Sequence, residues 1–248
     1  MSEAASHCLD LVRRHDRDRF LSTLFAPDAA RPHLLALYAF NTEIVRIRSI
    51  VTEPQIGLIR LQWWRDTVEG GSGGGHPVAE ELHKAIVGGG LPKQALLDLV
   101  TAHEFDLFHD PMPDIGALEA YLGETSSRLI QMAAMILDRE AAQKASEIAG
   151  LAGVAHGLAL IFGDPARRGP FLPNGMSVAA AIAHARKRLA EARALQPGLP
   201  KHLLPAFLSV SLTDLYLARI EKSPDAALSV SSFRRQYTLW RNARRETF

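Results

Sequence analysis

The chain has 248 residues, enough for one large domain, and a chain of this length buries about 70 % of its unfolded surface when it folds. Its 28 Lys and Arg balance 27 Asp and Glu, and a net charge of +1 is too small for a general nucleic-acid binder. Apolar residues make up 47 % and charged residues 22 %, which excludes a mostly disordered chain. The single cysteine, Cys8, excludes a disulfide framework and a cysteine-rich metal site.

No stretch of the sequence is typical of a membrane span or a targeting segment. The longest apolar run, Leu151 to Gly163, is shorter than the roughly 18 residues of a transmembrane helix, and it carries His156. This run predicts a buried helix. The first residues, Met1 to Leu11, contain Glu3 and Asp10 and lack the continuous apolar stretch of a signal peptide. We therefore expect the protein in the cytoplasm.

Apolar residues recur at three- and four-residue spacing over long stretches, whereas alternating strand patterns are scarce. In His33 to Val51 a single stripe holds Leu34, Leu37, Tyr38, Asn41, Ile44, Val45 and Arg48. Helices are predicted, in chain order, at residues 2–14, 33–51, 55–69, 77–88, 92–108, 114–137, 140–163, 176–194, 201–221 and 230–245. About ten helices in one chain predict an all-α helical bundle.

Three glycine- or proline-rich segments interrupt the helical pattern. Residues 70–75 are five glycines and a serine, which cannot hold a helix and lack the Lys-Ser or Lys-Thr of a phosphate-binding loop. A flexible loop is predicted there. Residues 88–92 and 110–114 predict turns between helices. Each neighbouring helix is too apolar on one face to stand alone, so residues 1–248 are predicted to form one domain.

Residues 13–19 alternate basic and acidic side chains. The segment contains Arg13, Arg14, Asp16, Arg17, Asp18 and Arg19. The alternation lowers the local net charge and favours ion pairs within the protein over binding to a polyanion.

Several segments together carry a resemblance to a known family. They are DRFLSTLFAP at 18–27, LYAFN at 37–41, RLQWWRD at 60–66, Asp106, Tyr121 and RRGPFLP at 167–173. In order and spacing the chain resembles the squalene/phytoene synthase family over residues 7–245. The resemblance implies the all-α isoprenoid-synthase fold. It also implies a central cavity, which in active members takes two prenyl diphosphates and joins them head to head.

The resemblance implies two Asp-x-x-x-Asp motifs on facing helices in active members. Departure of diphosphate needs Mg²⁺, a hard cation that carboxylates bind, and two carboxylates one helical turn apart point at shared metal ions. Here the first motif falls on Val45 and Ser49, and the second on Asp164 and Arg168. Neither motif keeps both acids. No metal site and no cofactor are therefore expected; Mg²⁺ is expected only if the chain is an active synthase.

The resemblance also marks candidate residues of the cavity. They are Tyr38, Asn41, Arg46, Arg48, Gln62, Trp63, Arg65, Asp106, Tyr121, Asp164 and Arg167. Arg46 and Arg48 place fixed positive charge beside the degenerate motif, which suits either an anionic ligand or ion pairs with acids of the cavity. The ligand expected is an anionic lipid or a prenyl diphosphate, bound without ionisation chemistry. Trp63 and its neighbour Trp64 face about 100° apart on a helix, so one is expected in the core and the other at its edge.

The C-terminal segment combines aromatic and basic residues. Its candidate surface residues are Phe233, Arg234, Arg235, Tyr237, Trp240, Arg241 and Arg244. The three aromatic residues follow one another at i, i+4 and i+7. Such a helix suits an anionic membrane surface or an acidic partner. The alternative is a final helix docked on the bundle with solvated arginines, and the two can coexist.

Two functions follow from these patterns. The lost metal ligands favour a non-catalytic descendant, and Leu37 to Asn41 with Arg60 to Arg65 resemble a branch of the family, the phytoene-synthase-like assembly factors of respiratory complex I (NADH:ubiquinone oxidoreductase). That branch implies complex I subunits or assembly intermediates as partners, and a place in the cytoplasm or at the inner face of the membrane. The alternative is a Mg²⁺-dependent prenyltransferase that condenses two farnesyl or geranylgeranyl diphosphates and keeps feeble activity through Asp106, Asp110 and Asp164.

Overall fold

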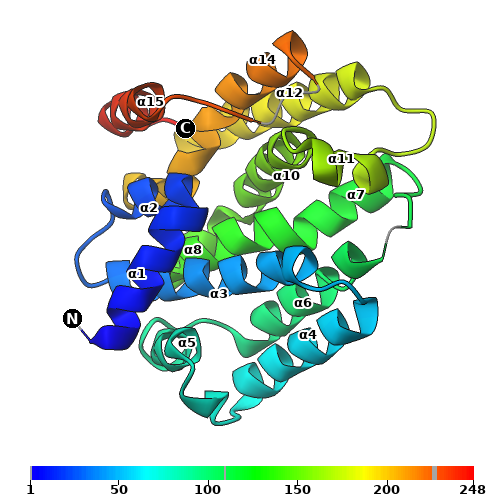
Figure 1. The fold of residues 1–248 in the computed structure, drawn as a ribbon. Helices are drawn as coiled ribbons and strands as arrows, with labels where there is room; N and C mark the ends of the chain where they lie inside the picture. Colours follow the sequence, from blue (N-terminus) through cyan, green and yellow to red (C-terminus); the bar gives the residue numbers. More distant parts are fainter. Residues whose placement is uncertain (1, 109, 225–227) are drawn as a thin grey trace.

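The computed structural model describes residues 2–108, 110–224 and 228–248, which form helices and no β-strand (Figure 1). The first half contains α1 (Glu3–His15), α2 (Arg17–Thr23), α3 (Arg31–Ile50), α4 (Pro54–Glu69), α5 (Pro77–Gly88) and α6 (Lys93–Ala102). The second half contains α7 (Ile115–Leu122), α8 (Arg128–Leu137), α9 (Arg139–Lys144), α10 (Ser146–Phe162), α11 (Pro165–Phe171), α12 (Val178–Leu195), α13 (Leu204–Phe207), α14 (Thr213–Lys222) and α15 (Ser232–Arg245). The all-α prediction is confirmed.

Shorter helical turns connect these helices. The 3₁₀ turns are Gly73–Gly75, Phe105–Leu107, Gln196–Gly198, Lys201–Leu203 and Leu208–Leu212, and a π-helical turn spans Gly123–Ser127. The predicted helix at 114–137 is thus α7, the π-helical turn and α8 in succession, and the predicted helix at 201–221 is a run of 3₁₀ and α-helical segments ending with α14.

Helix α10 runs through the middle of the bundle and packs against α12, α8 and the π-helical turn (Figure 1). Buried apolar side chains gather in two clusters, and α10 contributes to both, with Ala152 and Ala155 in the first and Leu158 and Phe162 in the second. The first cluster joins α10 to α1, α3, α5, α6 and α8, and the second joins it to α7, α11, α12 and α14. Each large apolar side chain buried in this way stabilises the fold by about 1.5–3 kcal/mol.

Two short helices beside α1 and α10 were absent from the predicted set. Asp16 caps α2 by accepting a hydrogen bond from the Arg19 amide (3.2 Å), and Asp164 caps α11 by accepting one from the Ala166 amide (3.0 Å). Capping aspartates stop the preceding helix and start a new one in another direction. The chain therefore bends by 118° between α10 and α11.

Two predicted helices end earlier or break. The predicted helix at 92–108 ends at Ala102, because His103 turns out of the helical path and its Nδ1 lies 2.8 Å from Asp106 Oδ2. The predicted helix at 140–163 is interrupted at Ala145, whose φ of −93° and ψ of 9° separate α9 from α10.

The segment Lys201–Lys222 is the one continuous helical stretch in the described ranges that is long and apolar enough to cross a membrane by itself. Of its most apolar window, 78 % is buried inside the bundle. Leu212 and Leu217 on this stretch belong to the second cluster of buried side chains. Such burial is typical of a helix in the core of a bundle, whose apolar surface is already covered by protein.

The glycine-rich run between α4 and α5 forms a tight 3₁₀ turn. Gly73, Gly74 and Gly75 all have positive φ angles, a region that residues with a Cβ atom rarely adopt. At Gly73 a Cβ atom would also lie 2.7 Å from Ala79 Cβ. These positions need glycine for the conformation itself; the flexibility of the loop stays a prediction.

His156 predicts a measurable dependence of stability on pH. It is fully buried in α10, with Nδ1 3.1 Å from Thr213 Oγ1, and burial, together with the charge of Arg19, lowers its pKa to about 3. In the unfolded chain a histidine has a pKa of about 6.5. The folded state binds this proton more weakly, so the stabilisation is complete above the unfolded pKa and is lost as the pH falls below it. We expect His156 alone to lower the free energy of unfolding by about 3 kcal/mol between about pH 7 and about pH 4.

Urea unfolding of the wild type and of His156→Gln at a series of pH values checks this expectation. The variant removes the titrating group, so its free energy of unfolding should change less between pH 7 and pH 4. Two parallel curves would contradict the assignment of this pH dependence to His156.

Candidate functional site

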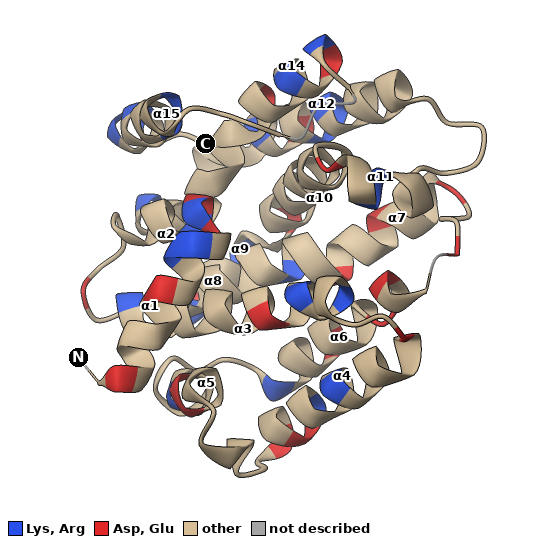
Figure 2. Ribbon diagram, in the orientation of Figure 1, with Lys and Arg blue, Asp and Glu red and all other residues tan. Residues whose placement is uncertain are grey.

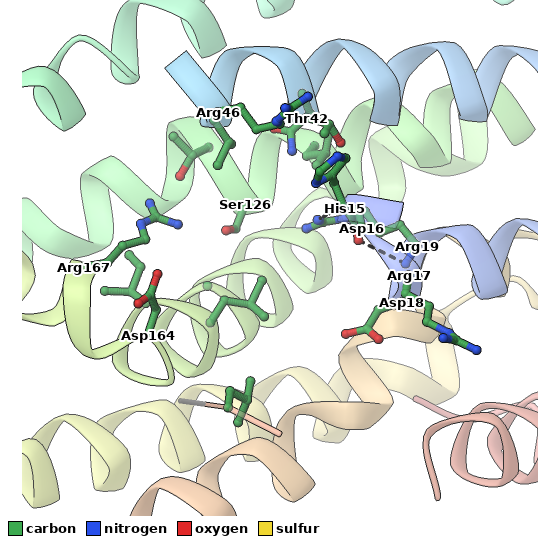
Figure 3. Close-up of a pocket in the computed structure, with 18 of the residues that line it drawn as sticks. His15, Asp16, Arg17, Asp18, Arg19, Thr42, Arg46, Ser126, Asp164 and Arg167 are labelled. Atoms are coloured by element: carbon green, nitrogen blue, oxygen red, sulfur yellow. Dashed lines mark hydrogen bonds and ion pairs between the residues drawn. The ribbon is translucent and has the colours of Figure 1, made fainter. Parts of the chain in front are cut away.

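A cavity of about 570 Å³ opens between the helices (Figure 3). Its wall is built from the junction of α1 and α2, the middle of α3, the π-helical turn, α10 and the beginning of α11. This volume lies in the range of roughly 300–1,000 Å³ that is usual for small-molecule sites. The cavity is the candidate functional site.

The π-helical turn gives the cavity one of its walls. Thr125 and Ser126 of this turn line the cavity, and so does Gly157 of α10. A Cβ atom at Gly157 would lie 2.6 Å from Ser126 Oγ, so α10 and the turn are packed at the closest distance that glycine allows. Single π-helical turns occur frequently at functional sites.

Basic side chains dominate the charge of the cavity. The lining contains six arginines and three aspartates, namely Arg14, Arg17, Arg19, Arg46, Arg167 and Arg235 with Asp16, Asp18 and Asp164. Figure 3 shows Arg167 and the α1–α2 junction on opposite sides of the cavity, with Arg46 reaching in from α3. The cavity therefore attracts anions.

Each lining aspartate already has a structural partner. Asp16 binds the guanidinium of Arg19 at 2.6 Å, in agreement with the predicted internal pairing of residues 13–19. Asp18 lies 2.6 Å from Arg235 Nε and accepts a hydrogen bond from the Tyr216 hydroxyl; even so, burial raises the pKa of Asp18. Asp164 caps α11.

The positions of the two degenerate motifs do not form a metal site. Val45 and Asp164 line the cavity, whereas Ser49 donates a hydrogen bond to the backbone oxygen of Arg46 (2.8 Å) and Arg168 donates one to that of Phe162 (2.9 Å). Over residues 2–108, 110–224 and 228–248, no group of three or more His, Cys, Asp or Glu is placed to hold a metal ion. The residues present do not fit the Mg²⁺–diphosphate centre that the resemblance implies for active synthases.

A buried polar network lies behind the cavity wall. Asp106 receives a hydrogen bond from the Tyr121 hydroxyl (2.7 Å), lies 2.8 Å from His103 Nδ1, and is 3.7 Å from the guanidinium of Arg167. Burial opposes ionisation of Asp106, but His103 and Arg167 outweigh it and lower the pKa of this carboxyl. The network holds Tyr121 and Arg167 in place at the cavity.

The second ring nitrogen of His103 takes no part in this network. His103 lines the cavity, its side chain is buried, and its Nε2 has no hydrogen-bond partner within the described ranges. A buried polar atom without a partner costs about 1–3 kcal/mol. His103 Nε2 is therefore available to a polar group of a ligand.

The structure brings together only part of the predicted cavity set. Asn41, Arg46, Tyr121, Asp164 and Arg167 line the cavity, and Asp106 supports two of them from behind.

The other predicted cavity residues of α3 lie outside the lining. Tyr38 is buried in the core under the guanidinium of Arg19, 5.8 Å from its ring centre. Arg48 reaches across to donate a hydrogen bond to the backbone oxygen of Ala166 (3.2 Å), so it ties α3 to α11.

Gln62, Trp63 and Arg65 require a correction, because α4 lies on the outer side of α3 and these side chains do not reach the cavity. Gln62 donates a hydrogen bond to Asp66 (2.7 Å), and Arg65 forms an ion pair with Glu104. Trp63 is half-exposed, whereas Trp64 is buried, as the spacing of the two residues predicted. The ion pair of Arg65 holds α4 against the segment after α6, and the hydrogen bond of Gln62 stays within α4.

The cavity also uses residues that the sequence pattern did not single out for it. His15 and Arg17 reach it from the α1–α2 junction, where the alternating charges had indicated only internal pairing. Arg235 was predicted on the outer surface of the last helix, but its side chain is 18 % exposed and turns inward to Asp18. No local signal distinguishes this arginine from its neighbours, because its partner lies more than 200 residues earlier in the chain.

Comparisons with known proteins place this geometry in a family. The chain is 31 % identical over 261 residues to "NADH dehydrogenase (ubiquinone) complex I, assembly factor 6" of Bos taurus, with 94 % of this chain and 78 % of the relative covered. The Homo sapiens protein of the same name is also 31 % identical, over 87 % of this chain and 73 % of the relative. The Drosophila melanogaster homolog is 29 % identical, over 88 % and 76 %.

Solved structures share the fold. A dehydrosqualene synthase in complex with ligand superposes with a TM-score of 0.78 at 17 % identity, covering 96 % of this chain and 95 % of that one. Squalene synthase HpnC from Alicyclobacillus acidocaldarius gives 0.71 at 19 % identity, covering 91 % and 95 %. The bundle thus has the all-α isoprenoid-synthase fold. A model of squalene/phytoene synthase matches residues 12–167, and the chain belongs to the squalene/phytoene synthase family.

Proposed function

We propose that this chain is a non-catalytic member of its family that acts in the assembly of respiratory complex I. The relatives named as complex I assembly factors support the role. The observation that carries the non-catalytic part is the loss of both acid pairs: Val45 and Ser49 occupy the first pair of metal-ligand positions, and Arg168 stands where Asp164 would need an acidic partner. The partners proposed are complex I subunits or assembly intermediates.

The chemistry of the synthase alternative is hard to perform with these residues. Diphosphate leaves an allylic carbon only when its developing negative charge is stabilised, which Mg²⁺ held by paired carboxylates does in active synthases. Here the carboxylate of Asp106 already contacts the Tyr121 hydroxyl and the His103 ring, and the carboxylate of Asp164 caps α11. Neither has a second acid one helical turn away on the cavity wall.

The cavity nevertheless retains the features of a binding site, and we infer that it holds an anionic phosphate-bearing molecule, either a lipid or a prenyl diphosphate, without a metal ion. Arg46 of α3 and Arg167 of α11 supply charged donors to the cavity. Charge-assisted hydrogen bonds from guanidinium groups to phosphate are strong and directional. Binding of this kind leaves the ligand intact.

Purified protein incubated with farnesyl or geranylgeranyl diphosphate and Mg²⁺ is expected to release no diphosphate and to form no condensed prenyl product. A dehydrosqualene synthase assayed in parallel serves as the positive control, and circular dichroism verifies that the sample is helical. Turnover above the no-protein background would overturn the non-catalytic assignment.

The assembly role is tested in the organism that carries the gene. Deletion is expected to lower NADH:ubiquinone oxidoreductase activity in isolated membranes, and the wild-type gene should restore it. Asp164→Asn is the discriminating variant, because asparagine also caps a helix but cannot replace a Mg²⁺-binding carboxylate. Restoration by this variant supports assembly; failure of a stably folded Asp164→Asn protein to restore activity would favour the synthase alternative.

A further inference from the structure

Helix α15 lies at the edge of the bundle (Figure 1). It presents three exposed aromatic rings to solvent. Phe233, Tyr237 and Trp240 are 79 %, 50 % and 47 % exposed and form what we call the aromatic stripe. Their ring centres follow one another at 6.3 Å and 6.2 Å. Positions i, i+4 and i+7 share one face of a helix, so the stripe is a continuous apolar ridge.

The opposite face of α15 holds the helix on the bundle. Thr238 and Leu239 are buried there, and Arg235 pairs with Asp18 at 2.6 Å. Leu239 lies one residue from Trp240 and therefore points about 100° away from it. The aromatic stripe is thus directed outward by a helix that is anchored from behind, and the protein covers none of the three rings fully.

The charge around the stripe is positive. Arg234, Arg241, Arg244 and Arg245 stand on α15, and in the described ranges none of these four forms an ion pair with an acid. The nearest acid along the chain, Glu246, forms an ion pair with Lys201. The guanidinium of Arg244 lies over the Trp240 ring, 5.1 Å from its centre, so charge and apolar surface meet on one face. Figure 2 shows basic residues and no acidic residue on α15.

A groove beside the first turn of α15 extends this positive surface. It lies between α14 and α15, encloses about 460 Å³, and its lining includes Arg219, Lys222 and Arg234. Ser229 and Ser231 add hydroxyl groups to the same groove. A phosphate group in this groove would therefore meet cations from both α14 and α15.

We propose that α15 is a membrane-docking helix that binds an anionic lipid surface. The aromatic stripe enters the headgroup region, where Trp and Tyr rings are favoured, and the surrounding arginines contact lipid phosphates. Each basic residue close to an anionic surface strengthens binding several-fold. This inference goes beyond the assembly role and does not depend on it.

The shape of the surface favours lipid over an acidic protein as the occupant. The aromatic stripe is a convex ridge about 10 Å long, because a helix rises about 1.5 Å per residue over seven residues. Arginines flank it on α15, and the helix exposes no large aliphatic side chain. A protein partner is usually held by a well-packed apolar centre fitted into a pocket. A lipid surface needs no matching shape.

Sedimentation of the full chain with vesicles tests the proposal. The protein is expected to bind vesicles of equimolar phosphatidylglycerol and phosphatidylcholine and to bind pure phosphatidylcholine much more weakly. Phe233→Ser/Tyr237→Ser/Trp240→Ser should abolish sedimentation with the anionic vesicles. Ile59→Ser/Val87→Ser is the matched control, because it removes exposed apolar side chains on α4 and α5, away from α15, and should bind like the wild type.

A second pair of variants separates charge from apolar insertion. Arg241→Gln/Arg244→Gln/Arg245→Gln is expected to weaken binding to the anionic vesicles about hundredfold, as three surface arginines predict. Arg60→Gln/Lys144→Gln/Lys187→Gln removes the same charge elsewhere and should weaken binding far less. The Trp240 emission should shift to the blue when anionic vesicles are added, a signal that Trp240→Phe removes.

Three outcomes would overturn the proposal. They are equal sedimentation with neutral and anionic vesicles, wild-type binding by the aromatic triple variant, and binding of polyglutamate without binding of vesicles, which would indicate an acidic protein partner. None of these results bears on NADH:ubiquinone oxidoreductase activity in the deletion strain. The docking surface and the assembly role therefore succeed or fail separately.

Discussion

Gly153→Ala is expected to lower the free energy of unfolding by about 3 kcal/mol, and Gly153→Val to lower it further. Gly153 of α10 faces the π-helical turn, and a Cβ atom there would lie 2.3 Å from Ser127 Cα and 2.5 Å from Ser127 N. Both are backbone atoms, so no rotamer change relieves the clash. The turn and α10 would have to separate, which would also deform the cavity wall at Thr125 and Ser126.

Gly150→Ala supplies the matched control on the same helix. A Cβ atom at Gly150 meets nothing within 4 Å, so alanine there should stabilise α10 by up to about 1 kcal/mol through its higher helix propensity. Urea unfolding followed by circular dichroism measures both variants. Similar free energies of unfolding for Gly153→Ala and Gly150→Ala would show that the close approach of α10 to the π-helical turn is wrong.

Arg46→Gln/Arg167→Gln is expected to weaken binding of inorganic pyrophosphate at least about hundredfold, because each arginine lost removes a charged hydrogen bond of roughly 1.5–3 kcal/mol. The two side chains reach the cavity from α3 and α11. Arg46 is the freer of the two, since its side chain is 38 % exposed and that of Arg167 is 21 % exposed. Arg167 is held by Asp106 at 3.7 Å and so needs little reorganisation to bind an anion.

Isothermal titration calorimetry with pyrophosphate measures this effect, first in EDTA and then with Mg²⁺. The wild type should bind in EDTA, and Mg²⁺ should not strengthen the binding, because the cavity lacks a carboxylate pair for the metal. Arg60→Gln/Lys187→Gln is the control, because it removes two positive charges at residues that do not line the cavity. Pyrophosphate binding that requires Mg²⁺, or that survives the loss of Arg46 and Arg167, would refute the metal-free anion site.

Helix positions were predictable wherever a long apolar stripe exists, as in α3, α4, α5 and α12. The short helices α2 and α11 were not, because seven residues show too little of a periodic pattern, and an aspartate cap looks like any other acid in the sequence. Both of these helices border the cavity. The least predictable local structure thus positions several of the charged groups in the candidate site.

The prediction of cavity residues was least accurate on α4, where no predicted residue lines the cavity. The segment at 60–66, which carries part of the family resemblance, contains Gln62, Trp63 and Arg65. A sequence motif shared by a family can reflect a conserved packing contact as readily as a ligand-binding residue. In the fold, Arg65 pairs with Glu104 and Trp63 packs edge-on to Trp64 with ring centres 4.8 Å apart. The Arg65 ion pair joins α4 to the segment after α6, whereas the contact between Trp63 and Trp64 stays within α4.

The sequence by itself determined that the chain is all helical, that it belongs to its family, and that Val45 and Ser49 stand where two carboxylates would be needed. Residue identity and helical period are local properties, so they can be read along the chain. The tertiary structure decided which charges share the cavity, because Arg235 meets Asp18, and Arg46 faces the same cavity as Arg167, only after distant helices pack. It also decided that Leu239 faces the bundle and Trp240 faces outward, because the core accepts only one face of α15.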